Sequence, residues 1–308
     1  MTKTTQPSSA LRKAWLDATR PRTLPLALSC IALGTFLATA AGVYSWPITT
    51  LCLVTAVFLQ ILSNLANDYG DSIHGADHVR REGPQRAVQS GQISAQTMKR
   101  AMFLFAGLSA VSGLALIWLA FGAEGLVGLL VFGVLGGAAI WAAVNYTAGR
   151  KPYGYAGWGD LFVLIFFGWV GVLGPFFLMA QRLDWRLLLP ATSCGLLAVA
   201  VLNVNNIRDI ESDRQAGKFS IPVRLGPAWA RVYHWILMGT AVFLATLYVL
   251  LTFTSYWAFL YVLAVPLLVR NGTAVQNTLS PLKLNPLLKQ MVLSALAFNL
   301  LLGLGLIL

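Results

Sequence analysis

The amino-acid sequence predicts an all-α, polytopic membrane protein with about nine transmembrane helices, organised as one domain over residues 1–308. Hydrophobic residues make up 57% of the chain and charged residues only 11%, whereas a water-soluble domain carries about 25% charged residues. Apolar runs without any charge recur along the whole chain, and the basic residues between them are distributed very unevenly.

The apolar runs have the length of membrane spans. In chain order they lie near residues 25–44, 48–66, 101–121, 125–144, 161–180, 187–207, 232–253, 256–269 and 290–308. A bilayer crossing takes about 20 apolar residues, so most of these runs are long enough to span with some tilt. The run at 256–269 is the exception, because it is short and contains Pro266. Nine crossings leave no room for a separate soluble domain.

The Lys and Arg residues predict the orientation, since short loops rich in them stay on the cytoplasmic side. Five precede the first run, five separate the second and third, two the fourth and fifth, five the sixth and seventh, and three the eighth and ninth. Only Arg182 and Arg186 fall on the other side. We therefore expect a cytoplasmic N-terminal segment over residues 1–24. This pattern also accounts for much of the net charge of +11, and no nucleic-acid partner is expected.

Most of the few acidic residues gather in and just after two short segments. The first acidic segment is NLANDYGDSIHGAD at 64–77, after the second run, and the second acidic segment is NVNNIRDIESD at 203–213, after the sixth. They form a weak internal repeat, in which an Asn-rich helix end is followed by spaced Asp residues. The predicted topology places both segments on the cytoplasmic side.

Helical spacing places oxygen-bearing side chains of each segment on one face, if the spans continue as helices. The first face carries Asn64, Asp68 and Asp71, and the second carries Asn205, Asp209 and Asp213. Like charges at this spacing repel, and carboxylates oppose the dipole at a helix C-terminus, so a bound cation is expected. Asp and Asn oxygens suit Mg²⁺, which typically binds one or two carboxylates together with substrate phosphates. Two facing clusters therefore predict a diphosphate bridged by Mg²⁺.

Basic residues beside the acidic segments are candidates for holding diphosphate oxygens. They are Arg80, Arg81 and Arg86 after the first segment, and Arg208, Arg214 and Lys218 around the second. The connection TAGRKPYGYAGWGD at 147–160 adds Lys151 on the same side, and such a loop can fold over a site. The alternative is that these residues are solvated loop charges that follow the positive-inside rule.

A metal and diphosphate site at the mouth of an apolar bundle predicts a substrate with a charged head and a hydrocarbon tail. Polyprenyl diphosphate fits this description. Metal coordination would stabilise the departing pyrophosphate as its charge develops. A water-poor, aromatic-lined cavity would protect the resulting allylic cation from hydrolysis. These residues alone leave the acceptor open.

Several motifs together resemble the UbiA superfamily of intramembrane aromatic prenyltransferases, over essentially the whole chain. They are RPRTLPLA at 20–27, ILSNLANDYGD at 61–71, KPYGYAGWGD at 151–160, FFGW at 166–169 and NNIRDIESDR at 205–214. In their exact residues, these motifs are similar to those of the branch that acts on 1,4-dihydroxy-2-naphthoate. The resemblance implies nine helices around a central cavity, Mg²⁺ dependence and a bacterial cytoplasmic (inner) membrane location with the active site facing the cytoplasm. It implies transfer of a polyprenyl chain to 1,4-dihydroxy-2-naphthoate with loss of its carboxylate and of pyrophosphate, giving demethylmenaquinone.

The resemblance also assigns residues. Those implied to bind the metal and diphosphate are Asn67, Asp68, Asp71, Asp77, Asn205, Asn206, Asp209 and Asp213. The general superfamily spacing would put an acid at position 75, where this chain has Gly75, which leaves the direct role of Asp77 open. Further substrate contacts, assigned more by position than by motif, are Arg22, Asn64, Tyr146, Lys151 and Tyr153.

Two other functions fit parts of this pattern. One is the 4-hydroxybenzoate polyprenyltransferase branch of the same superfamily, which differs in its acceptor. The other, from a different class, is a secondary transporter, since polytopic bundles with internal repeats are often transporters. Transporters usually carry polar or charged groups near the midplane, and the predicted spans here carry no charge. No protein partner is needed for the predicted reaction.

Overall fold

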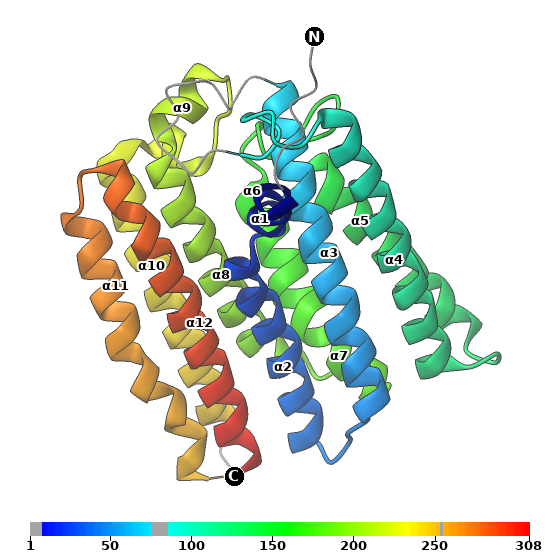
Figure 1. Cartoon of the computed structure of the whole chain (residues 1–308). Coiled ribbons are helices and arrows are strands. Elements are labelled where there is room, and N and C mark those ends of the chain that lie inside the picture. The colour runs from blue at the N-terminus through cyan, green and yellow to red at the C-terminus, as the bar shows by residue number, and fades with distance from the viewer. Residues whose placement is uncertain (1–7, 75–85, 253–254) are drawn as a thin grey trace.

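The computed structural model describes residues 8–74, 86–252 and 255–308, and within these ranges the regular structure is entirely helical (Figure 1). The N-terminal part contains α1 (Ser8–Thr19), α2 (Leu24–Ala40), α3 (Trp46–Ile73), α4 (Ala95–Phe121) and α5 (Leu126–Asn145). The middle part contains α6 (Gly159–Val163), the π-helix η2 (Leu164–Leu173), α7 (Gly174–Ala180), α8 (Leu188–Arg208) and α9 (Ile210–Gln215). The last part contains α10 (Ile221–Leu251), the 3₁₀ segment η4 (Tyr256–Ala264), α11 (Val265–Asn277) and α12 (Leu284–Ile307).

The predicted spans are confirmed. Nine helical segments of the described chain are long and apolar enough to cross a membrane, and each overlaps one of the predicted runs. Several are longer than predicted. The short run with Pro266 is completed by η4 and α11, which together reach Asn277. The helix α10 begins at Ile221, ahead of the predicted 232, and bends at Gly226, whose φ of 77° is a conformation that favours glycine, before Pro227.

The helix α8 forms the centre of the bundle. It packs against α10, α12 and η2, and its side chains Leu197, Ala200 and Val204 are completely buried. Small residues let the helices approach closely: a Cβ added to Gly168 of η2 would lie 3.0 Å from the Cα of Gly195 on α8. Close packing through small residues is how helices associate where no water is present to drive them together.

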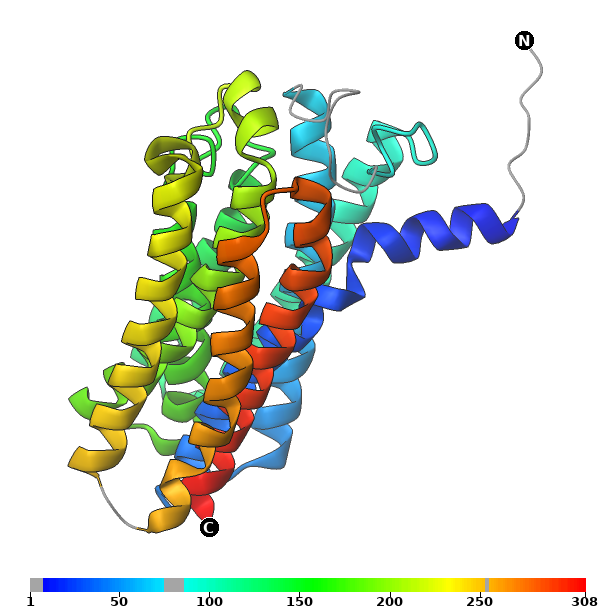
Figure 2. The ribbon, with the colours of Figure 1, turned by 90° about the vertical axis from the view of Figure 1, so that its left-hand side faces the viewer.

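The first helix, α1, lies crosswise to the other helices of the bundle (Figure 2). Its residues Ala14 and Ala18 are buried. A corner at residues 20–23 joins α1 to α2, and Asn64 of α3 holds it by donating to the carbonyl of Thr19 and the hydroxyl of Thr23, at 2.9 and 3.1 Å. The sequence predicted only an N-terminal segment here.

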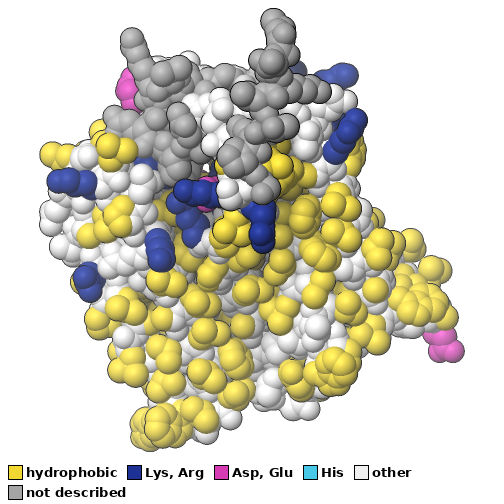
Figure 3. All heavy atoms as spheres, in the orientation of Figure 1, with side chains coloured by type: hydrophobic (Ala, Val, Ile, Leu, Met, Phe, Trp, Pro, Cys, Tyr) yellow, Lys and Arg dark blue, Asp and Glu magenta, His cyan; other side chains and the backbone are white. Residues whose placement is uncertain are grey.

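The described residues of both acidic segments lie at one end of the bundle, where α3 and α8 end and α9 follows (Figure 1). We call this end, the upper one in Figure 1, the polar end. Figure 3 shows hydrophobic side chains over most of the visible face, with Lys and Arg side chains gathered in its upper part. This distribution is the one expected for a membrane protein whose site opens at one surface.

Candidate functional site

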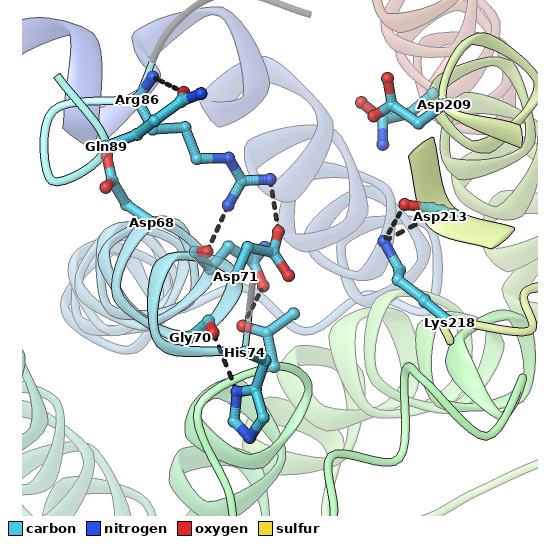
Figure 4. A network of polar contacts seen from close by, with 12 residues as sticks. Asp68, Gly70, Asp71, His74, Arg86, Gln89, Asp209, Asp213 and Lys218 are labelled. Atoms are coloured by element: carbon cyan, nitrogen blue, oxygen red, sulfur yellow. Dashed lines mark hydrogen bonds and ion pairs between the residues drawn. The ribbon is translucent and has the colours of Figure 1, made fainter. Parts of the chain in front are cut away.

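The last turns of α3 carry the first acidic segment into the polar end. Asp71 is 3% exposed. Its carboxylate is paired with the guanidinium of Arg86, at 2.5 Å (Figure 4). It also accepts a hydrogen bond of 3.1 Å from the phenol of Tyr155. The same guanidinium donates to the backbone carbonyl of Asn67. Arg86 therefore joins the chain after the first segment to the segment itself.

Asp68 faces a different group from Asp71. Its two carboxylate oxygens accept hydrogen bonds of 3.0 Å from the backbone N–H groups of Ala87 and Val88. Its neighbour Asn67 accepts a hydrogen bond of 2.9 Å from the hydroxyl of Thr147 at its side-chain oxygen. These contacts anchor two other segments, 86–88 and 147, to the end of α3. Asp77, Arg80 and Arg81 lie outside the described residues.

The second acidic segment begins where α8 ends. Asp209, with φ −98° and ψ 9°, separates α8 from α9, although the hydrogen bonds from Asp209 to Asn205 and from Asp213 to Asp209 continue the helical pattern. Its carboxylate is held by both sides of the Arg208 guanidinium, at 2.7 and 2.6 Å. Arg208 also donates to the side-chain oxygens of Asn205 and Asn285. This fork fixes the position of Asp209.

Asp213, one turn further on, is paired with Lys218. The ammonium Nζ lies 3.3 Å from one carboxylate oxygen and 3.2 Å from the other, and both side chains are buried. Burial raises the pKa of the Asp213 carboxyl to about 6, against the opposing effect of Lys218. Burial alone lowers the pKa of the ammonium, but the carboxylates of Asp213, Asp71 and Asp209 outweigh it and raise the pKa. Lys218 therefore stays charged and lies within the field of both acidic segments.

Tyr155, in the connection between α5 and α6, links the two segments. Its hydroxyl donates to Asp71, and Nζ of Lys218 lies 6.0 Å from the centre of its ring. Its backbone carbonyl accepts a hydrogen bond of 2.9 Å from Phe219, directly after Lys218. Figure 4 shows Asp71 on one side and Asp209, Asp213 and Lys218 on the other side of one space. The two acidic segments thus converge, as the sequence predicts.

Tyr146 directly follows α5, at the start of the connection to α6. The side chain is half-buried, and burial raises the pKa of its phenol to about 12, with smaller contributions from Lys218, Asp213, Asp160 and Asp71. The ring of Tyr146 lies edge-on to the ring of Tyr153, with 5.5 Å between their centroids. The hydroxyl of Tyr153 donates to the carbonyl of Ala142, and its ring stacks on Phe162 at 4.0 Å.

The remaining predicted contacts are placed elsewhere. Asn64 holds the corner between α1 and α2, where Arg22 lies exposed in the short turn Pro21–Thr23. Arg214 is exposed and pairs with Glu211 at 3.4 Å. Lys151 is exposed, and no described hydrogen bond or ion pair joins it to the acidic segments. The structure thus brings together Asp71, Asp209, Asp213, Arg86 and Lys218, and does not bring Asn64, Arg214 or Lys151 into contact with them.

The oxygen atoms at this site fit a hard divalent cation. The side-chain oxygen of Asn206 is buried and accepts no hydrogen bond from the described residues, whereas the buried carboxylate of Asp213 is paired with the Lys218 ammonium. Buried acceptors without a donor are unfavourable unless a ligand satisfies them. Within residues 8–74, 86–252 and 255–308, no three Asp, Glu, His or Cys side chains already meet as a ready-made metal cage. Mg²⁺ seldom uses such cages and takes much of its coordination from substrate phosphates and water.

One residue of the site, Tyr155, was not predicted as a site residue. Tyr155 stands in the glycine-rich connection at 147–160, so the sequence signals its loop. The turn from Pro152 to Tyr155 decides which aromatic residue faces the carboxylates. Arg208 follows the pattern of basic residues next to acidic ones, but its role as a fork on Asp209 depends on where α8 ends.

The chain matches the model of the UbiA prenyltransferase family over residues 27–281. It is 49% identical over 297 residues to the 1,4-dihydroxy-2-naphthoate octaprenyltransferase of Escherichia coli (strain K12), and the match covers 96% of each chain. This similarity spans both acidic segments and the connection at 147–160.

The fold is also similar to solved structures. An apo structure of a UbiA homolog from Aeropyrum pernix K1 superposes with a TM-score of 0.67, covering 92% of this chain and 96% of the other at 17% identity. A UbiA homolog from Archaeoglobus fulgidus, bound to GPP and Mg²⁺, superposes with a TM-score of 0.59, covering 96% and 99% at 17% identity. At this identity the likeness concerns the fold.

Proposed function

Since this chain belongs to the UbiA prenyltransferase family, we propose that it transfers a polyprenyl chain from polyprenyl diphosphate to 1,4-dihydroxy-2-naphthoate. The bond between the prenyl carbon and the diphosphate oxygen breaks, and pyrophosphate leaves. A new carbon–carbon bond forms at the ring carbon that loses its carboxylate as CO₂. No electrons are gained or lost, so the product is the quinol form of demethylmenaquinone.

One structural observation carries the proposal. Tyr155 joins the two acidic segments: its phenol donates to Asp71, and its ring lies 6.0 Å from the Lys218 ammonium that pairs with Asp213. Carboxylates from two segments 138 residues apart, Asp71 to Asp209, are brought together only by the fold. A diphosphate carries several negative charges, so it can enter a space lined by carboxylates only together with cations. The carboxylates therefore favour a substrate diphosphate bound with a metal ion over a neutral substrate.

The ligand set proposed for the metal comprises Asn67, Asp68, Asp71, Asp77, Asn205, Asn206, Asp209 and Asp213. The convergence of Asp71, Asp209 and Asp213, and the buried side-chain oxygen of Asn206 that accepts no hydrogen bond from the described residues, support these four as direct ligands. Asp68 instead holds the segment after residue 86 in place. Bound Mg²⁺ would supply positive charge to the leaving pyrophosphate. The A. fulgidus homolog, with GPP and Mg²⁺ bound, supports this proposal.

The chain's own residues have separate tasks in this proposal. Arg86 and Lys218 donate to diphosphate oxygens, and Arg22 takes part from the exposed corner next to α2. Arg214 and Lys151 remain proposed contacts for the outer part of the ligand. Tyr146 and Tyr153 line the space below the diphosphate, where their rings exclude water from the allylic carbon and can stabilise its positive charge. The apolar helices provide the surroundings for the prenyl tail.

We propose a bacterial inner membrane location, with the polar end facing the cytoplasm. The basic residues support this orientation, since all but two of the 22 Lys and Arg residues belong to connections on that side.

The direct test offers the purified protein one polyprenyl diphosphate with either 1,4-dihydroxy-2-naphthoate or 4-hydroxybenzoate, with Mg²⁺ or with EDTA. We expect a prenylated product, CO₂ and pyrophosphate only with the naphthoate and Mg²⁺. Transfer to 4-hydroxybenzoate without transfer to the naphthoate would overturn the acceptor assignment, and undiminished transfer in EDTA would overturn the metal assignment.

A further inference from the structure

Lys218 occupies the place beside Asp213 that a metal ion would need. Its ammonium contacts both oxygens of that carboxylate, at 3.3 and 3.2 Å, and each of the two side chains is 7% exposed. Asp71 and Asp209 add to the negative field around the same ammonium. In the metal-free protein, Lys218 is therefore the resident counter-ion of Asp213.

A metal ion and Lys218 cannot share this carboxylate without another anion. Mg²⁺ bound to Asp213 would lie a few ångströms from the ammonium, and like charges repel strongly where little water is present. The buried ammonium would also lose its partner, and an unpaired buried charge is strongly unfavourable. A diphosphate resolves both problems because it gives the ammonium new oxygen partners.

Lys218 is better suited to change partners than the other cation of the second segment. Arg208 is held by four hydrogen bonds, to Asp209 on two atoms and to Asn205 and Asn285. The described contacts of Lys218 are the ion pair with Asp213 and the face of the Tyr155 ring. A flexible four-carbon stem can carry the ammonium between acceptors, whereas a forked guanidinium is fixed by its geometry.

We propose that Lys218 makes the binding of Mg²⁺ and of diphosphate mutually dependent: it neutralises Asp213 in the metal-free protein and moves to a diphosphate oxygen when Mg²⁺ takes the carboxylate. The inference rests on the proposed function for its ligand. Tyr155 acts as a positioning residue, because its ring keeps the ammonium near the space between the two acidic segments. Such coupling is reciprocal, so each ligand strengthens the binding of the other.

The test measures Mg²⁺ binding to metal-stripped full-length protein by calorimetry, without any diphosphate. We expect Lys218→Gln to bind Mg²⁺ about tenfold more tightly than the unmodified protein, because the competing cation is gone. The same variant should bind Mg²⁺ with inorganic pyrophosphate less tightly than the unmodified protein. Lys99→Gln is the matched control, since Lys99 is an exposed lysine on α4, and it should leave both affinities unchanged. Lys218→Arg keeps the cation and should not gain affinity for Mg²⁺ alone.

A variant that is unstable without metal also gives an answer. If Lys218→Gln unfolds on addition of EDTA and stays folded in Mg²⁺, then Mg²⁺ has replaced the ammonium as counter-ion, as expected. The inference is overturned if Lys218→Gln binds Mg²⁺ no more tightly than Lys99→Gln, or if it is unfolded at every Mg²⁺ concentration.

These binding measurements do not depend on turnover. A protein that gains Mg²⁺ affinity through Lys218→Gln but transfers no prenyl chain to the naphthoate would retain this inference and lose the proposed function. If the unmodified protein transfers the prenyl chain to the naphthoate but Lys218→Gln leaves Mg²⁺ binding unchanged, the proposed function is retained and this inference is lost.

Discussion

The phenol of Tyr155 donates a hydrogen bond of 3.1 Å to the carboxylate of Asp71, although 84 residues separate them. Because the backbone of Tyr155 also accepts from Phe219, the connection between α5 and α6 fastens the end of α3 to the chain after α9. The position of the two acidic segments relative to each other therefore depends on this connection, although it contributes none of the proposed metal ligands.

Removing this hydrogen bond should weaken catalysis without abolishing it. Tyr155→Phe keeps the ring under Lys218 but leaves Asp71 without its phenol donor. We expect kcat to fall about tenfold and the Mg²⁺ concentration for half-maximal rate to rise, since one hydrogen bond to a charged group is worth about 1.5 to 3 kcal/mol. Initial rates over a Mg²⁺ series provide the measurement. An unchanged Mg²⁺ dependence would mean that Tyr155 does not position Asp71.

Neutralising one carboxylate in either acidic segment should nearly eliminate turnover. For Asp71→Asn and for Asp209→Asn we expect kcat to fall by about 100-fold or more, the scale found when a group that stabilises transition-state charge is removed. Membrane insertion should be unaffected, because these side chains act on the ligand. Pyrophosphate release and the yield of protein in the membrane fraction are the two measurements. Near-normal rates for both variants at limiting Mg²⁺ would argue against a two-segment site.

Lower pH should raise the stability of the metal-free protein and reduce the extra stability that bound Mg²⁺ provides. The pKa of Asp213 is about 6, above its ordinary value of 3.8, because the carboxyl is buried. The metal-free folded state therefore takes up a proton before the unfolded chain does, and Asp213 makes the free energy of unfolding rise as pH falls through 6. Metal binding requires the ionised carboxylate, so affinity for Mg²⁺ should fall over the same range.

Thermal unfolding from about pH 7.5 to about pH 5.5 checks this expectation. The difference in Tm between samples with Mg²⁺ plus pyrophosphate and samples with EDTA should shrink as pH falls. Asp213→Asn, which cannot titrate, isolates the contribution of this carboxyl. A difference that stays constant in the unmodified protein would show that Asp213 is not the titrating ligand.

Close packing at Gly70 should be essential to the site. A Cβ at this position would lie 2.4 Å from the backbone carbonyl carbon of Thr147, so Gly70→Ala must push the 147–158 connection away from α3. We expect a loss of about 1 to 3 kcal/mol in stability and a large loss of activity. Gly107→Ala on α4 is the matched control, because its Cβ would meet no atom within 4 Å. Equal stabilities and rates for the two variants would contradict this packing.

The membrane architecture could be predicted from the sequence because burial in lipid depends on composition alone. Charge-free runs mark the spans but do not mark where the helices begin and end. The helix α3 continues to Ile73, through polar residues that hydropathy assigns to a loop, and α10 begins eleven residues early at Ile221. The crosswise helix α1 was missed, since its mixed polar sequence resembles a loop and it is held by tertiary contacts such as those of Asn64.

The carboxylates of the site could also be predicted, because acidic residues are rare in this chain and cluster at two helix ends. Their partners could not. Helical spacing placed Asn64, Asp68 and Asp71 on one face, yet Asn64 contacts the α1–α2 corner and Asp68 contacts the backbone of residues 87 and 88. Likewise, the pairing of Lys218 with Asp213 depends on the turn after α9, which spacing does not specify.

The central claim is that both acidic segments hold one metal-bound diphosphate. Anomalous scattering from Mn²⁺, in crystals grown with inorganic pyrophosphate, tests it most directly. We expect metal peaks within about 2.5 Å of an oxygen of Asp71 and of an oxygen of Asp209 or Asp213, with one pyrophosphate in contact with both sides. Metal bound at a single segment, or pyrophosphate bound away from both, would contradict the account.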